Sequence, residues 1–323
     1  MISRIYAIAR NTIFETIRQP VFLVVLMGAL TMIAFSPAFT MFTLVNHIKL
    51  VTDMGLATIM VTGMLLSVVA ASTVISEEIR KKTVLTVISK PVDRFEFVLG
   101  KYAGIMVSIV IAGYLMVLVL TMTVRIGVPA TASTRLDFGP VMGMLLGTGF
   151  VLFGAILANY FFDRPFPSTA ICLALVVFSL AFGIVGLLPP VSDTLKERFL
   201  HYNWSVTLAG ILIMLAVSVI ATVAVAVSTR LNPLFTFSIC AAFFVIGLVV
   251  EELLRKYAGG SAVLTFPLRA FFNIQYFFLA DALSSEREIP FNYIIRAVLY
   301  AATYQAAILC GALYLFQDRE VAR

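Results

Sequence analysis

Charged side chains are scarce in this sequence. Only 12% of its 323 residues are Asp, Glu, Lys or Arg, and 61% are hydrophobic, whereas about a quarter of the residues in a soluble domain are charged. A water-soluble globule could not bury so much apolar surface. The composition therefore excludes an ordinary soluble protein and predicts a chain that lipid surrounds over much of its length.

Charge is absent altogether from several long stretches. A helix needs about 20 apolar residues to cross a bilayer, and a spanning segment must pair its own backbone groups. Eight charge-free runs are long enough: Gln19–Ile48, Met54–Ser76, Tyr102–Val124, Phe138–Phe162, Pro165–Ser192, Phe199–Thr229, Leu231–Val250 and Ala297–Gln317. We expect an all-α, polytopic helical integral membrane protein with about eight transmembrane helices in a single domain, residues 1–323. If the pair within Phe199–Val250 did not cross fully, the chain would have six spans.

Residues that carry out chemistry are also few. The three cysteines, Cys172, Cys240 and Cys310, lie inside apolar runs, so we expect no disulfide. The two histidines, His47 and His201, lie on different loops, and the sequence contains no HExxH, GxSxG or GxxxxGKS/T motif. We therefore expect no catalytic, cofactor or metal site on this chain. Its net charge of +6 suits anionic membrane lipid and does not call for nucleic acid.

The orientation follows from the basic residues, which are slightly more frequent on one side of the predicted spans. Because Lys and Arg are enriched in cytoplasmic loops, we expect both termini in the cytoplasm and Glu251–Tyr293 outside. Within that outer segment, Phe266–Phe278 is rich in phenylalanine. It could form an aromatic girdle or a re-entrant lid, with substrate contact as a further alternative.

The first residues have an amphipathic pattern. At 100° per residue, one half of a helix over Ile2–Ile17 is apolar, and the other half carries Arg4, Asn11, Glu15 and Arg18. The apolar half consists of Ile2, Ile5, Ile8, Ala9, Ile13 and Ile17. We predict a helix that lies along the cytoplasmic membrane surface before Pro20 turns the chain inward. A plain membrane anchor is the simpler alternative.

Charge is concentrated in one stretch, SEEIRKKTVLTVISKPVDRFEFVLGKY, which runs from Ser76 to Tyr102. It could be a solvated loop that fixes topology or a patch that binds lipid headgroups, but its mixed signs and interspersed apolar residues favour docking of a soluble partner. The predicted docking residues are Glu77, Glu78, Ile79, Arg80, Lys81, Lys82, Thr83, Lys90, Pro91, Arg94 and Phe95.

This stretch resembles a known family. Its order of Glu77-Glu78-Ile79, Lys82-Thr83, Val87 to Val92 and Leu99 to Tyr102 is similar to the cytoplasmic loop of type-2 ATP-binding-cassette (ABC) transporter permeases, in the branch of the nitrous-oxide-reductase maturation and gliding-motility permeases. The resemblance covers roughly Met1–Phe162 and Phe271–Arg323. It implies that residues 2–17 form an elbow helix and residues 76–97 a cytoplasmic coupling helix. The family commonly has six spans, so the pair within Phe199–Val250 would be additional.

The resemblance implies the permease subunit of an ATP-driven exporter in the cytoplasmic (inner) membrane of a bacterium or archaeon. Its partners would be ABC ATPase subunits, which carry the ATP and Mg, together with a second permease chain and membrane lipid. The alternatives are a secondary transporter and an intramembrane enzyme. No charged side chain lies within the eight runs, which argues against ion coupling. Asn159 is the best polar candidate inside a span. Gly100-xxx-Gly104 and Gly143-xxx-Gly147 permit close helix packing.

Overall fold

The computed structural model describes residues 2–40, 47–76, 94–126, 136–191, 193–196, 199–256, 270–279 and 290–317. These residues form helices and connections without a strand, and eight helices are long and apolar enough to cross a membrane. They are α2 (Pro20–Thr40), α3 (His47–Ala71), α6 (Arg94–Ile126), α7 (Phe138–Phe162), α8 (Phe166–Leu187), α10 (Trp204–Ser228), α11 (Pro233–Lys256) and α14 (Phe291–Gln317). The prediction of an all-α polytopic membrane protein with eight spans is confirmed.

Shorter elements join or precede these spans. The N-terminal helix α1 (Ile2–Ile17) leads through Arg18 and Gln19 into α2. A π-helical turn, η1 (Ser72–Ser76), ends α3, and a short helix, α9 (Asp193–Lys196), follows α8. Two 3-10 turns, η2 (Phe199–His201) and η3 (Ile274–Phe277), precede α10 and α14 respectively.

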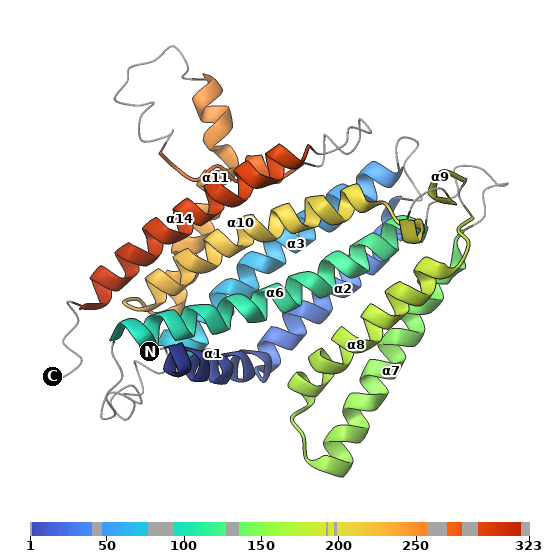
Figure 1. The fold of residues 1–323 in the computed structure, drawn as a ribbon, viewed down its shortest axis with the longest axis horizontal. Helices are drawn as coiled ribbons and strands as arrows, with labels where there is room; N and C mark the ends of the chain where they lie inside the picture. Colours follow the sequence, from blue (N-terminus) through green and yellow to red (C-terminus); the bar gives the residue numbers. More distant parts are fainter. Residues whose placement is uncertain are drawn as a thin grey trace.

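Three helices form the centre of the bundle. In the most apolar stretch of each helix, the buried share is 72% for α3, 67% for α6 and 72% for α10, compared with 11% for α14. The α10 sequence is rich in alanine, valine, serine and threonine, and such small side chains let neighbouring helices approach closely. Figure 1 shows α10, α3 and α6 running side by side, with α14 on one flank.

The helices α7 and α8 form a hairpin at the edge of the bundle (Figure 1). The hairpin turn is made by Asp163, which has a left-handed φ of 50°, and Pro165, which precedes α8. The pair within Phe199–Val250 was expected to be additional to a six-helix core. In the structure only α10 of this pair belongs to the centre, whereas α11 is as little buried as α7 of the edge hairpin.

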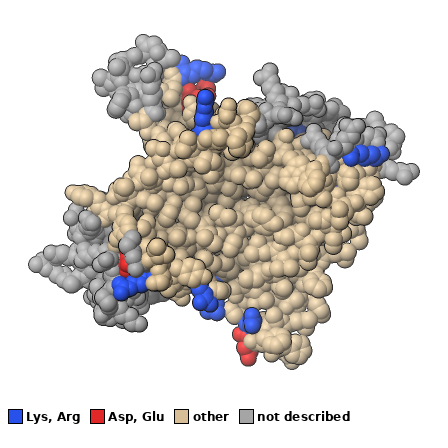
Figure 2. Space-filling model, viewed as in Figure 1, with Lys and Arg blue, Asp and Glu red and all other residues tan. Residues whose placement is uncertain are grey.

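Charges lie at the two ends of the bundle. In Figure 2 the visible Lys, Arg, Asp and Glu side chains gather at the margins, and a broad uncharged band separates them. The start of α1, the end of α14 and the η1 end of α3 lie at the same end of the molecule (Figure 1). We call this the terminal end and the other the distal end.

Candidate functional site

Most of the predicted docking residues, Glu77 to Thr83 together with Lys90 and Pro91, lie outside the described residues. Arg94 is the first residue of α6, and Phe95 beside it is 43% exposed. The two stems of the predicted docking segment are therefore described: η1 leads into it, and the first turns of α6 follow it. Both stems lie at the terminal end of the bundle, where α1 packs against them.

The helix α1 lies directly on the start of α6. A Cβ added to Gly100 would lie 2.7 Å from Cβ of Ile8, and one added to Gly104 would lie 2.5 Å from Cβ of Thr12 and 2.7 Å from the carbonyl oxygen of Ala9. Real Cβ atoms do not approach this closely. The Gly100-xxx-Gly104 pattern is therefore a packing surface, and the helix packed against it is the amphipathic α1 and not another span.

Two ion pairs flank this contact. Lys101 Nζ lies 3.0 Å from Glu15 Oε2, and the Lys101 side chain is only 4% exposed. Arg4 Nη1 lies 3.7 Å from Glu96 Oε2, which is also buried. The charge-free runs placed the start of this span at Tyr102, but α6 begins at Arg94 because its charged residues are paired with α1.

The other stem contacts the same N-terminal segment. The Thr73 hydroxyl in η1 donates to Gln19 Oε1 at 2.8 Å and shares its one proton with the Val69 carbonyl of the preceding turn at 2.7 Å. Gln19 immediately precedes α2, and its backbone N–H donates to the Thr16 carbonyl at the end of α1. The π-helical geometry of η1 widens the last turn of α3, and such turns frequently occur at functional positions.

The helix predicted over Ile2–Ile17 is confirmed, but its apolar half does not form a single membrane-facing surface. The Ile8 side chain and the Ile5 carbonyl contact α6 at Gly100, whereas Ile2 is 83% exposed. Tyr6 and Phe14 are also exposed. Sequence periodicity could not separate the residues of α1 that contact α6 from those that are exposed, because both groups include apolar side chains.

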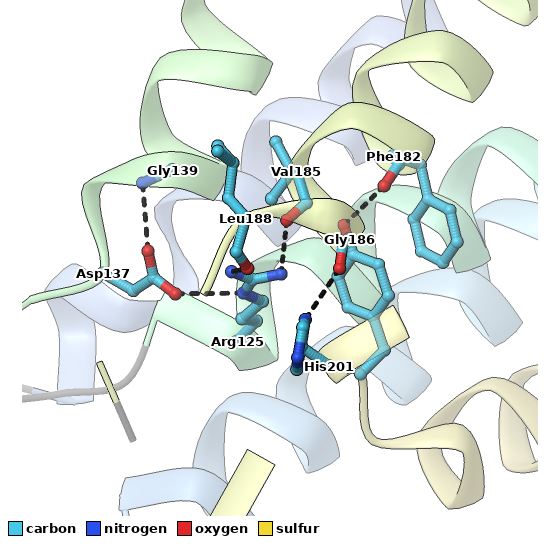
Figure 3. A network of polar contacts seen from close by, with 9 residues as sticks. Arg125, Asp137, Gly139, Phe182, Val185, Gly186, Leu188 and His201 are labelled. Atoms are coloured by element: carbon cyan, nitrogen blue, oxygen red, sulfur yellow. Dashed lines mark hydrogen bonds and ion pairs between the residues drawn. The ribbon is translucent and has the colours of Figure 1, made fainter. Parts of the chain in front are cut away.

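A second polar cluster lies at the distal end, around a buried arginine that sequence analysis did not single out (Figure 3). Arg125, near the end of α6, donates from Nε to Asp137 Oδ2 at 3.0 Å. It also donates from Nη1 to the Val185 carbonyl at 2.6 Å and from Nη2 to the Leu188 carbonyl at 2.8 Å. Asp137 in turn caps α7 by accepting from the Gly139 N–H at 3.1 Å. One guanidinium thus joins the start of α7 to the end of α8.

The segment before α10 completes this cluster. Tyr202 is fully buried, stacks on Phe182 at 4.1 Å between ring centroids and donates to its carbonyl oxygen at 2.9 Å. His201 Nδ1 lies 2.8 Å from the Gly186 carbonyl and must carry the proton, since a carbonyl only accepts. Burial raises the pKa of Tyr202 above its ordinary value, and the nearby Arg125 charge offsets part of that rise. The Val185, Gly186 and Leu188 carbonyls, at and just beyond the end of α8, receive side-chain donors in this way.

The helix interiors are joined by neutral hydrogen bonds. Thr121 and Thr207 join α6 to α10 at 2.9 Å, and Gln305 of α14 donates to Ser218 of α10. Asn159, the polar candidate from the sequence, donates to the Arg164 carbonyl at 2.7 Å. It closes the turn after its own helix and binds no neighbouring span.

The phenylalanine-rich segment, which we expect to lie outside, is described over residues 270–279. Phe272 and Phe277 are fully buried, and the Phe272 ring stacks on Tyr300 of α14 at 5.6 Å. The Asn273 N–H donates to the Tyr300 hydroxyl at 3.0 Å, and Gln275 Nε2 donates to the Leu248 carbonyl of α11 at 2.6 Å. This packing between helices fits the re-entrant alternative better than a surface girdle, because the polar backbone groups are paired within the protein.

Across the part of the chain that the structure describes, no group of three or more His, Cys, Asp or Glu side chains could hold a metal ion. Comparison of the sequence with models of known protein families gives no match, and comparison with curated proteins gives none either.

Proposed function

We propose that this chain is the permease subunit of a type-2 ABC exporter, with ATPase subunits that dock on residues 76–97. The observation that supports this most directly is that the N-terminal segment, α1 and the Gln19 that follows it, contacts both stems of the mixed-charge segment, through Gln19 to Thr73 and through Glu15 to Lys101. A loop that only fixed topology would not need two supported stems.

The positions of the stems support a mechanical role. The first stem follows the end of α3, and the second is the beginning of α6. The helices α3 and α6 are two of the three most buried helices of the bundle. Since packed helices move as rigid elements, displacement of the docking segment by an ATPase would shift the centre of the bundle. ATP binding and hydrolysis would take place on the partner, and this chain would convert its movement into alternating access.

The uncharged middle of the bundle bears on the cargo. The described spans are joined in their interiors by threonine, serine, glutamine and tyrosine side chains. Ion-coupled carriers use ionisable groups at mid-depth. A hydrophobic or amphiphilic substrate, exported between this chain and a second permease chain, therefore fits best. We place both termini and the docking segment on the cytoplasmic side.

Charge reversal in the docking segment tests this proposal. We expect the Glu77→Lys/Glu78→Lys and Lys90→Glu/Arg94→Glu variants to insert into the membrane normally but to lose co-purification of an ABC ATPase, identified by mass spectrometry. The matched control is Arg255→Glu/Lys256→Glu, which reverses two charges in the last turn of α11 at the distal end. This control should retain the ATPase.

Retention of the ATPase by both docking-segment variants would contradict the proposal. Transport that follows a proton or sodium gradient and ignores ATP depletion would establish the secondary-transporter alternative. Substrate turnover by the purified chain without an ATPase would establish the enzyme alternative.

A further inference from the structure

The N-terminal helix contacts both stems of the docking segment and not only one. Glu15 in the last turns of α1 pairs with Lys101 of α6, and Gln19 just beyond α1 accepts from Thr73 of η1. In sequence, Glu15 and Lys101 are separated by 86 positions and Gln19 and Thr73 by 54. Glu15 and Gln19, four positions apart in sequence, thus connect the beginning of α6 to the end of α3.

We infer that α1 is a brace which sets the separation of the two stems, and that Glu15 and Gln19 are its positioning residues. This inference deepens the proposed function and rests on it for its role in ATPase coupling. The separation of the stems is a property of the permease chain alone, so it can be measured independently.

The contact on α6 is suited to a rigid brace. Gly100 and Gly104 let the side chains of Ile8 and Thr12, together with the adjacent α1 carbonyls, lie directly on the α6 backbone. Lys101, which lies between these glycines in sequence, is almost completely buried beside Glu15. A buried ammonium is costly to desolvate, and loss of a carboxylate 3.0 Å away removes a large part of the attraction that offsets this cost. Loss of the Glu15 carboxylate should therefore displace α1 from α6.

The contact on η1 is of another kind. Thr73 and Gln19 are only partly buried, and a single neutral hydrogen bond joins them. Such bonds contribute modestly to stability. The brace therefore holds the α6 stem firmly and the η1 stem weakly, so an ATPase that pushes on the docking segment would move η1 more easily than the start of α6.

Distance measurement between the stems tests the inference. The full-length chain, with Cys172, Cys240 and Cys310 replaced by alanine, carries spin labels on Ser76→Cys and Phe95→Cys. Pulsed electron paramagnetic resonance in lipid nanodiscs then measures the distance between the two stems. We expect a narrow distance distribution that becomes broad with Glu15→Lys, because two positive charges then face each other. The swapped pair Glu15→Lys/Lys101→Glu should restore the narrow distribution.

The matched control is Arg10→Glu, which reverses a charge on α1 whose guanidinium lies 5.8 Å from the Phe14 ring of the same helix. It should leave the distribution unchanged. In chains without spin labels, Glu15→Lys should lose ATPase activity stimulated by the permease, and the swap should regain it.

The outcomes separate the two ideas. An unchanged stem distance in Glu15→Lys, or a broad distribution in the swapped pair, would overturn the brace. If the distances respond as expected but the docking-segment charge reversals leave ATPase binding intact, the brace stands and the proposed docking site fails.

Discussion

Arg125 Nη1 on α6 lies 2.6 Å from the carbonyl oxygen of Val185 on α8. The same guanidinium pairs with Asp137 at the start of α7. This places the strongest polar link between the peripheral hairpin and the central helices at the distal end of the bundle.

Removal of this guanidinium should destabilise the protein. Arg125→Met leaves the Asp137 carboxylate buried without its cation and removes the charged donor to the Val185 and Leu188 carbonyls, and we expect a loss of about 3–5 kcal/mol in the free energy of unfolding. Thermal unfolding in detergent, followed by size-exclusion chromatography, measures it. Arg164→Met, the same change in the exposed turn between α7 and α8, should have little effect. Equal losses in both variants would contradict this role of Arg125.

The close contact of α1 with α6 can be tested by adding a single methyl group. Gly104→Ala places a Cβ 2.5 Å from Thr12, and overpacking of this kind costs about 1–3 kcal/mol. Gly28→Ala on α2 is the matched control, because nothing lies within 4 Å of its added Cβ. We expect a lower unfolding temperature for Gly104→Ala than for Gly28→Ala. Equal temperatures would mean that α1 can shift without cost.

Alkaline pH should weaken the distal cluster through Tyr202. Its pKa is raised by burial above the ordinary 10.0, so the folded state keeps the phenol proton at a pH where the unfolded state releases it. Stability from this group is therefore complete below pH 10 and is lost as the pH rises further. Between about pH 9 and 11, wild type should lose more thermal stability than Tyr202→Phe, which cannot ionise. Parallel losses would exclude Tyr202 as the titrating group.

The packing of residues 270–279 depends on the Tyr300 hydroxyl. Tyr300→Phe removes the acceptor for the buried Asn273 N–H, and an unsatisfied buried donor costs about 1–3 kcal/mol. Tyr314→Phe is the control on the same helix, since that side chain is 67% exposed. Thermal unfolding should distinguish the two variants. A similar stability for both would indicate that water replaces the Tyr300 hydroxyl.

Membrane orientation can be determined by labelling single cysteines. With the native cysteines replaced, a membrane-impermeant thiol reagent on intact cells should label Lys196→Cys, which lies in α9 beyond the distal end of α8. It should not label Arg164→Cys, in the turn at the other end of the hairpin. The reverse pattern would place both termini outside and would remove the docking segment from the cytoplasmic ATPase.

The spans were predictable because hydrophobicity along a helix is a local property. The Phe138–Phe162 helix coincides with a charge-free run, and the Trp204–Ser228 helix lies within one. The start of α6 was placed too late, because Glu96 and Lys101 were read as loop charges, whereas both are buried against α1. The role of Arg125 was missed for the same reason: a single arginine at the end of an apolar run resembles a topology signal.

The sequence by itself determined that this is an all-helical membrane protein, where its helices cross, and which stretch concentrates charge, since each follows from composition over neighbouring residues. Only the tertiary structure decided that α10 lies at the centre and α7–α8 at the edge. It also decided that Glu15 meets Lys101 and that Arg125 caps α8. Those contacts join residues far apart in the chain, and the packing that brings them together leaves no periodic signal in the sequence.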